Sequence, residues 1–321
     1  MQKITIGGNE AGQRFDKMLA KYLNKAPKSF LYKMLRKKNI TLNGKKATGS
    51  EKLQSGDEVK LFLSDETIAG FKESHFQFTD EKLDILYEDE NIALINKPAG
   101  MLSQKASPED VSLVEHFITY LIQSGQLTEE AMRAFRPSVC NRLDRNTSGI
   151  VAAGKSLAGL QELSSLFKDR TIGKYYLCLV EGCVEQPSYI RGFLKKNSRT
   201  NQVQITEKDF TGSSAIETEF VPLKTGSDTT LLEVHLITGK THQIRAHLAS
   251  AGHPILGDYK YGNPKVNGIC RAKYGLTHQL LHAYRITFPH LEGALSHLSG
   301  RQFTAALPQY FQKIAKDKGV F

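Results

Sequence analysis

A polar stretch without periodicity, residues 64–80, divides the chain of 321 residues into two parts with different patterns. Before it, residues 12–24 and 29–38 carry apolar side chains at helical spacing, and Asn43-Gly44 is a strong hairpin turn. After it, apolar runs of strand length dominate. These patterns predict a small helical and hairpin domain over 1–65, a linker over 66–80 and a larger domain over 81–321.

The larger domain has the pattern of an α+β fold. Helical spacing occurs at 112–122, 156–168 and 241–251. Strand patterns occupy 85–87, 92–95, 149–153, 174–180, 201–206, 216–221, 230–237 and 280–288. Because neighbouring strands have few helices between them, we predict a mixed, largely antiparallel sheet flanked by helices.

Positive charge is concentrated in the small domain. Residues 1–65 contain 14 Lys and Arg against 6 Asp and Glu, a net +8, whereas the other 256 residues carry 29 against 27, a net +2. No acidic residue lies between Lys25 and Lys46. A solvated surface normally mixes both signs, so this cluster favours a nucleic-acid-binding module that contacts phosphates. The candidate RNA-binding residues are Lys25, Lys28, Lys33, Arg36, Lys37, Lys38, Lys45 and Lys46.

The cysteines and the apolar runs exclude several classes of protein. Cys140, Cys178, Cys183 and Cys270 do not have the spacing of a zinc ribbon or of a disulfide framework. No apolar run approaches the roughly 18 residues of a membrane span, and the first residues lack the apolar segment of a secretion signal. We therefore expect a cytoplasmic protein with reduced thiols, no metal site and no membrane partner.

Residues 149–156 match the nucleotide-binding pattern G-x-x-x-x-G-K-[ST] letter for letter. In such a loop the pattern follows a buried strand. Here polar residues precede Gly149, and the apolar run Ile150–Ala153 falls inside the would-be loop. We interpret the run as a strand, so an enzyme that depends on a nucleoside triphosphate is the least favoured alternative.

One polar segment offers a candidate catalytic carboxylate. In Arg142-Leu143-Asp144-Arg145, an aspartate lies between two cations, which favours its ionised form. An ionised, positioned carboxylate can act as a nucleophile or a general base. From this segment alone, a structural ion pair in a loop is the stronger interpretation.

A second polar segment, Thr238 to Arg245, changes that balance. A strand ends there, and the chain turns at Gly239 and enters a helix, near whose N-terminus a ligand anion is favoured. Arg245 is available to pair with a carboxylate elsewhere. The residues at that N-terminus are Thr241, His242 and Gln243.

Both segments resemble motifs of the RluA-type pseudouridine synthases. The family signature His-Arg-Leu-Asp-x-x-Thr-Ser-Gly reads Asn141 to Gly149 here, with asparagine in place of histidine, and the family segment Thr-Gly-Arg/Lys-Thr-His-Gln-Ile-Arg matches 238–245. Four further segments also match the family and fall in family order along the chain: NKPAGM at 96–101, GKYYLCLVEG at 173–182, GHPILGDYKYG at 252–262 and LLHAYRITF at 280–288. The resemblance covers about 83–308.

The small domain resembles an S4 domain, an RNA-binding module, over residues 12–64. That resemblance depends on RFDKMLAKYL, PKSFLYKMLRKKNITLNGKKA and KLQSGDEV. With this module in front, the chain is most similar to the branch of the family that modifies bacterial ribosomal RNA. The strings PKSFLYKMLRKK and GFLKKN are similar to those of the large-subunit synthase C type.

The family resemblance implies roles for single residues. Asp144 matches the catalytic aspartate, Arg245 the arginine that pairs with it, and Tyr176 the active-site tyrosine that packs on the uracil. Arg142 matches the arginine that enters the helical stack where the target base has left. Lys97, in NKPAG, either supports the site or ends a strand. We expect Lys97, Thr241, His242 and Gln243 to help bind substrate.

The implied reaction isomerises uridine to pseudouridine: the C1′–N1 bond breaks, the uracil turns and a C1′–C5 bond forms. Nothing is oxidised or added, so we expect no cofactor. The resemblance implies a monomeric enzyme acting on structured RNA, above all bacterial 23S ribosomal RNA or a ribosome assembly intermediate. Two alternatives stay open: a pseudouridine synthase acting on transfer RNA, and a catalytically silent RNA-binding assembly factor.

Overall fold

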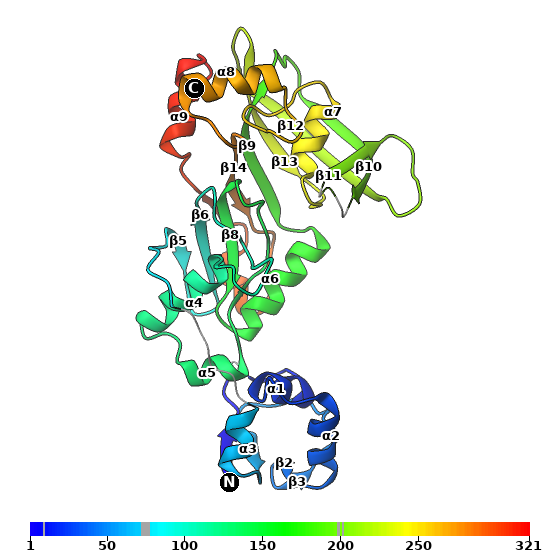
Figure 1. Ribbon diagram of the computed structural model, residues 1–321, viewed down its shortest axis with the longest axis vertical. Coiled ribbons are helices and arrows are strands. Elements are labelled where there is room, and N and C mark those ends of the chain that lie inside the picture. Colours follow the sequence, from blue (N-terminus) through cyan, green and yellow to red (C-terminus); the bar gives the residue numbers. More distant parts are fainter. Residues whose placement is uncertain (9, 72–77, 198–199, 201) are drawn as a thin grey trace.

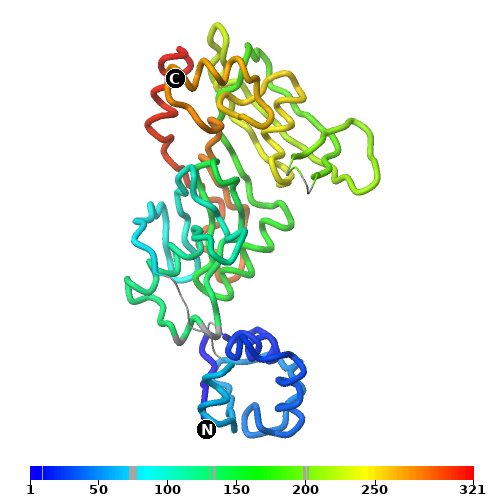
Figure 2. The backbone as a smooth tube through the Cα atoms, in the orientation of Figure 1, coloured from blue at the N-terminus to red at the C-terminus, as the bar shows by residue number. Residues whose placement is uncertain are grey.

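The computed structural model describes residues 1–321 except 9, 72–77, 198–199 and 201. Its ribbon shows the N-terminal domain at one end of the long axis and the last helices at the other end (Figure 1). The backbone tube shows the same separation of the two chain termini (Figure 2). Both views therefore show the first residues of the chain folded apart from the larger rest.

The N-terminal domain combines helices with a four-stranded sheet. Its core is apolar, and Phe15, Met18 and Leu19 of the first helix are fully buried in it. The sheet order is β1-β4-β2-β3, with every pair antiparallel. The elements are β1 (Gln2–Thr5), α1 (Phe15–Tyr22), α2 (Lys28–Arg36), β2 (Ile40–Leu42), β3 (Lys45–Lys46) and β4 (Glu58–Leu61).

The predicted linker over 66–80 begins instead with a helix, α3 (Asp65–Gly70). The Ser64 side chain caps it by accepting a hydrogen bond from the Thr67 backbone N–H. Ile68 is buried in the core of the N-terminal domain, and the Phe71 carbonyl accepts from the Lys25 N–H. Phe71 also packs on this core, with its ring centroid 4.6 Å from that of Phe30. The first domain therefore extends to about residue 71, because two apolar side chains in a polar stretch anchor the short helix and its end. Residues 72–77 of the predicted linker lie outside the described part.

The large domain is built on one sheet of eleven strands. The path is β11-β10-β12-β13-β9-β14-β8-β6-β5, with β15 added to β14 and β7 added to β8. Neighbours on the path are antiparallel apart from β14 and β8, which run parallel, so the sheet is mixed and largely antiparallel as predicted. The strands are β5 (Ile85–Glu88), β6 (Ile92–Lys97), β7 (Ser138–Val139), β8 (Ser148–Gly154), β9 (Gly173–Glu181), β10 (Ser188–Asn197), β11 (Gln202–Thr206), β12 (Ser214–Thr225), β13 (Thr229–Leu236), β14 (Leu281–Thr287) and β15 (Gln302–Thr304).

Helices cover both faces of this sheet. On one face, side chains of α4 (Leu113–Gln123) and α7 (Gln243–Ser250) share a core with alternate residues of β6, β8 and β9. On the other face, α6 (Leu157–Asp169) and the 3-10 helix η1 (Gly293–Leu298) pack on β6 and β8, while α8 (Pro264–Tyr274) and α9 (Gln309–Asp317) pack on β9 and β13. The short helix α5 (Glu129–Ala134) precedes β7. Strands buried on both faces explain the nearly continuous apolar run of β6.

Candidate active site

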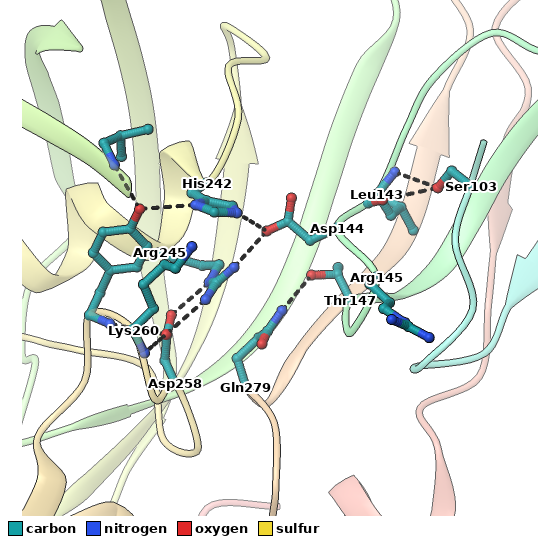
Figure 3. A network of polar contacts seen from close by, with 12 residues as sticks. Ser103, Leu143, Asp144, Arg145, Thr147, His242, Arg245, Asp258, Lys260 and Gln279 are labelled. Atoms are coloured by element: carbon teal, nitrogen blue, oxygen red, sulfur yellow. Dashed lines mark hydrogen bonds and ion pairs between the residues drawn. The ribbon is translucent and has the colours of Figure 1, made fainter. Parts of the chain in front are cut away.

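Asp144 lies on a polar loop, residues 141–147, between β7 and β8. The Asn141 amide fixes the start of this loop: its Nδ2 donates to the Ile150 carbonyl (3.2 Å), and its Oδ1 accepts from the Ala152 N–H (2.8 Å). Ser103 Oγ holds the main chain of Leu143 from both sides, with two hydrogen bonds of 3.0 Å (Figure 3). Asn141 differs from the histidine of the family signature. It is a positioning residue, because its amide forms hydrogen bonds with the backbone of β8.

The loop ends in a very close approach of two backbones. Gly149 of β8 has a φ of +112°, and a Cβ on it would lie 2.2 Å from the carbonyl oxygen of Ala283 in β14. Only glycine fits there without displacing the neighbouring strand. The one parallel strand pair on the path therefore fixes the direction in which the loop leaves the sheet.

Arg245 of α7 joins Asp144 to a second carboxylate. Its Nη1 lies 2.9 Å from Asp144 Oδ2, although the two residues are about a hundred positions apart in the sequence. Its Nε and Nη2 donate to the two oxygens of Asp258, at 2.7 and 2.9 Å (Figure 3). This bidentate pair orients the guanidinium, because a planar fork matches a carboxylate in one geometry.

Asp258 is the buried support of that pair. It is 1% exposed, and its Oδ1 also accepts from the backbone N–H groups of Lys260 and Tyr261. Burial alone would raise the pKa of Asp258, but the hydrogen bonds and charge of Arg245 hold that pKa below its usual range. The Asp144 side chain, in contrast, is 24% exposed to the cleft. One arginine therefore connects a buried structural carboxylate with an accessible one.

His242 is the third side chain around Asp144. Its Nε2 lies 3.9 Å from Asp144 Oδ2, and its Nδ1 lies 2.9 Å from Tyr261 Oη. Tyr261 Oη accepts from the Val203 N–H, and its own hydrogen can be donated to Nδ1; a neutral ring that accepts it carries its hydrogen on Nε2, toward Asp144. Burial lowers the pKa of His242, which favours this neutral form. His242 has a left-handed backbone, with φ of +55°.

These residues open into a cleft of about 1010 Å³. Tyr176 of β9 lines it and is 7% exposed. Burial, and then the charge of Asp144, raise the pKa of the Tyr176 phenol, so it stays protonated at neutral pH. Arg142 and Thr241 also line the cleft, and Arg142 is exposed. The structure thus brings together Asp144, Tyr176 and Arg245 with Arg142, Thr241 and His242.

Lys97 does not lie where we expected it. It was expected to help bind substrate, but its side chain is fully buried behind the loop and does not line the cleft. Its Nζ donates to three carbonyls, those of Pro98 (2.8 Å), Met101 (2.8 Å) and Arg145 (3.1 Å). Burial lowers the pKa of Lys97 to about 7, against the opposing charge of Asp144. Lys97 thus supports the loop that carries Asp144, because its ammonium links the Arg145 carbonyl to those of Pro98 and Met101.

Gln243, which we expected to help bind substrate, lines the cleft, and its amide is engaged inside the protein. It is 2% exposed, and both ends of its amide are occupied. Its Oε1 accepts from Thr238 Oγ1 (2.8 Å) and the Lys240 N–H (3.1 Å), while its Nε2 donates to the Glu217 carbonyl and to Thr218 Oγ1. The amide therefore fixes the turn that brings His242 and Arg245 into the cleft.

The predicted basic cluster of the N-terminal domain is solvent-exposed. All eight side chains are exposed, on α2, on β3 and in the adjoining turns. Seven of them form no ion pair or hydrogen bond through their side chains within the described residues: Lys28, Lys33, Arg36, Lys37, Lys38, Lys45 and Lys46. Such a surface can contact phosphates without first breaking internal pairs.

Three further expectations concerned a nucleotide-binding loop, metal sites and membrane spans. Residues 149–154 of the nucleotide-binding pattern lie in the buried strand β8, and Ser156 caps α6, so no phosphate-binding loop exists there. Among the described residues, no group of His, Cys, Asp and Glu side chains has the arrangement of a metal site. In the same part of the chain, no helix combines the length and apolarity needed to cross a membrane.

Sequence reasoning missed several supporting residues. Asp258 and Tyr261 stand in the quoted segment GHPILGDYKYG, and a carboxylate directly after a glycine turn was a usable signal. Ser103 and Gln279 carried no signal, because their partners, the Leu143 backbone and Thr147 Oγ1, are distant in the sequence. Polar residues at isolated positions reveal their roles only through such contacts.

The arrangement suits chemistry that needs an ionised, positioned carboxylate and an enclosed planar group. Asp144 is held by Arg245 and faces the cleft, and Tyr176 offers a ring for stacking. Among the described residues, ten Lys and Arg line the cleft, and Asp144 is the one acidic residue that does. Such a wall favours a polyanion.

Known proteins that are similar to this chain act on RNA according to their names, which agrees with a cleft suited to a polyanion. A family model described as RNA pseudouridylate synthase matches residues 91–250. Two bacterial proteins named ribosomal large subunit pseudouridine synthase C are similar over most of their length. That of Vibrio cholerae serotype O1 is 31% identical over 304 residues, 90% of this chain and 89% of that protein. That of Escherichia coli K12 is 32% identical over 301 residues, 89% and 88% of the two chains.

Among solved structures, human RNA pseudouridylate synthase domain containing 4 has the same fold. Its TM-score is 0.56 at 20% identity, over 72% of this chain and 91% of the human one. The family match includes the whole loop around Asp144 as well as Tyr176 and Arg245. With its mixed sheet, its carboxylate cleft and relatives above 30% identity along nine-tenths of its length, this chain belongs to the RNA pseudouridylate synthase family.

Proposed function

We propose that this enzyme isomerises specific uridines to pseudouridine in bacterial large-subunit (23S) ribosomal RNA. The observation that supports the proposal most is the accessible Asp144 carboxylate, held at 2.9 Å by Arg245 in a cleft lined with cations. The names of the relatives from Vibrio cholerae and Escherichia coli support the large ribosomal subunit as the source of substrate.

In this proposal, Asp144 is the catalytic residue. Its carboxylate attacks the sugar or the base, or removes a sugar proton, and each of these steps needs a carboxylate held in position, as Arg245 holds Asp144. The target uridine leaves its stack to reach the cleft, at a cost of roughly a few kcal/mol. Stacking on Tyr176, and Arg142 filling the vacated position, offset part of that cost.

We further propose that the N-terminal domain is an S4-like RNA-binding module. Its support is the row of exposed, unpaired cations on α2 and the β2–β3 hairpin, together with the net +8 of residues 1–65. Phosphate contacts of this kind add affinity for structured RNA and carry no base specificity. The enzyme then acts as a cytoplasmic monomer on 23S RNA or on an assembly intermediate.

The test is to map pseudouridine in total RNA from cells with and without the gene, and in purified 23S RNA treated with the enzyme. We expect one or a few uridines of 23S RNA to lose the modification without the gene and to regain it with purified enzyme. Asp144→Asn is the inactive control. Lost sites in transfer RNA alone would replace the substrate assignment, and no lost site would favour the assembly-factor alternative.

A further inference from the structure

Lys174 is a cation of the cleft that the proposed chemistry does not use. It lies on β9 two residues before Tyr176, so both side chains point to the same face of the sheet, and both line the cleft. Two residues of a strand span roughly 6.6 Å. The Lys174 ammonium is therefore within one nucleotide of a base that stacks on Tyr176.

The ammonium of Lys174 has no partner among the described residues. No hydrogen bond or ion pair reaches its Nζ, although the side chain is largely removed from solvent. Lys97, the other strongly buried lysine, satisfies its ammonium with three carbonyls. A half-buried cation without a partner is costly, because it has lost water and gained nothing in exchange. The Lys174 ammonium thus lacks a hydrogen-bonding partner in the part of the protein that the structure describes.

The neighbours of Lys174 increase that cost. Burial, and then the charge of Arg170, lower the pKa of Lys174 to about 8. Arg170 ends α6 in the left-handed conformation, with φ of +62°, a position at which glycine is the usual residue. Asp144, the one carboxylate among the described residues that line the cleft, is bound by Arg245. Two cations are therefore held side by side with no anion between them.

The turn opposite leaves the ammonium accessible. A Cβ built on Gly239 would lie 4.0 Å from Lys174 Nζ, so the absence of a side chain there leaves room beside the cation. Lys240, on the same turn, adds a further positive charge to this wall. The vacant side of Lys174 therefore faces the cleft, where the RNA would lie.

We propose that Lys174, assisted by Arg170, binds a backbone phosphate next to the target uridine and so fixes the sugar over Asp144. This inference rests on the proposed function only in taking RNA as the ligand of the cleft. A phosphodiester supplies the missing anion, and a charge-assisted hydrogen bond to Lys174 compensates the lost hydration. Lys174 is then a substrate-binding residue that acts in the same step as the stacking on Tyr176.

The test combines protein variants with a neutral phosphate in the RNA. Lys174→Met removes the charge, Lys174→Arg keeps it, and Lys313→Met, at an exposed unpaired lysine of α9, is the matched control. The substrate is a short RNA with a uridine that the wild-type enzyme converts, made with a methylphosphonate on its 5′ or its 3′ side. Any RNA that the enzyme converts can be used in this experiment. A wrong assignment of 23S RNA as the substrate is therefore distinguishable from a wrong assignment of the phosphate contact to Lys174.

We expect Lys174→Met to lower kcat/KM by about 10- to 100-fold, as for the loss of a hydrogen bond to a charged group. Lys174→Arg should keep most of the activity, and Lys313→Met all of it. One methylphosphonate should cause a similar loss with the wild-type enzyme and little further loss with Lys174→Met. Additive losses at both phosphates would overturn the proposal. If Lys174→Met failed to fold, wild-type turnover unaffected by either methylphosphonate would still overturn it.

Discussion

Arg245 links two carboxylates of different burial, so the same Asp→Asn substitution should affect stability differently at the two positions. Asp144→Asn removes a charge that is 24% exposed and makes one hydrogen bond to Arg245. The amide oxygen can still accept that bond, and Arg245 keeps Asp258, so we expect the free energy of unfolding to change by less than about 1 kcal/mol. Turnover should fall by a factor of about a thousand or more, or roughly 4 kcal/mol of barrier.

Asp258→Asn removes a charge that is 1% exposed and accepts four hydrogen bonds, two from Arg245 and two from backbone N–H groups. The amide NH2 of the asparagine would face at least one N–H donor and could not accept its hydrogen bond. The buried Arg245 guanidinium would also lose its ion pair at this position. Breaking such a buried pair costs about 3–5 kcal/mol. Activity should fall too, because Arg245 loses the fork that orients it toward Asp144.

The assay is thermal unfolding at neutral pH together with single-turnover formation of pseudouridine. We expect the Tm of Asp258→Asn to drop by more than about 5 °C, and that of Asp144→Asn to stay within about 3 °C of wild type. RNA binding should survive in Asp144→Asn. A stable Asp258→Asn variant, or an Asp144→Asn variant with near wild-type turnover, would refute this division between support and chemistry.

Three further predictions follow from the fold. Gly149→Ala places a Cβ against the β14 backbone and should cost more than about 2 kcal/mol of stability, whereas Gly268→Ala, with open space on α8, should gain up to about 1 kcal/mol; equal Tm values would contradict this. Burial lowers the pKa of His282 to about 4, so its contribution is complete above the unfolded value near 6.5 and is lost as pH falls toward 4. Urea unfolding should show a loss of roughly 3 kcal/mol between pH 7 and pH 4, and His282→Gln should flatten that dependence. Deleting residues 1–77 should leave the catalytic domain folded and lower the salt slope of RNA binding by about 0.7–0.9 per lost phosphate contact; an unchanged slope would exclude the basic cluster as an RNA contact.

The local sequence determined much of the fold. Period-two and helical patterns predicted most strands around the cleft and the helices α4, α6 and α7, because burial on one face of an element repeats with that element's own period. They also showed that 149–154 is a strand and not a phosphate-binding loop. The helix α9 was missed although Phe311, Ile314 and Ala315 are buried at helical spacing, so that signal was present in the sequence.

The sequence also determined the candidates for chemistry. A carboxylate between arginines at 142–145, and an arginine after a glycine turn at 245, were visible as residue types in order. That Asp144 and Arg245 lie 2.9 Å apart was decided only by the tertiary structure, because the pairing of β13, β9, β14 and β8 brings their two loops to the same cleft.

Tertiary structure alone also separated ligands from supports. Lys97, Gln243 and Lys174 are polar residues in quoted motifs, and nothing local distinguishes them. The polar side-chain atoms of Lys97 and Gln243 are bonded inside the protein, whereas no described residue accepts a hydrogen bond from the Lys174 ammonium. Whether a polar side chain supports the fold or awaits a ligand depends on which distant backbone groups reach it, and no local pattern records that.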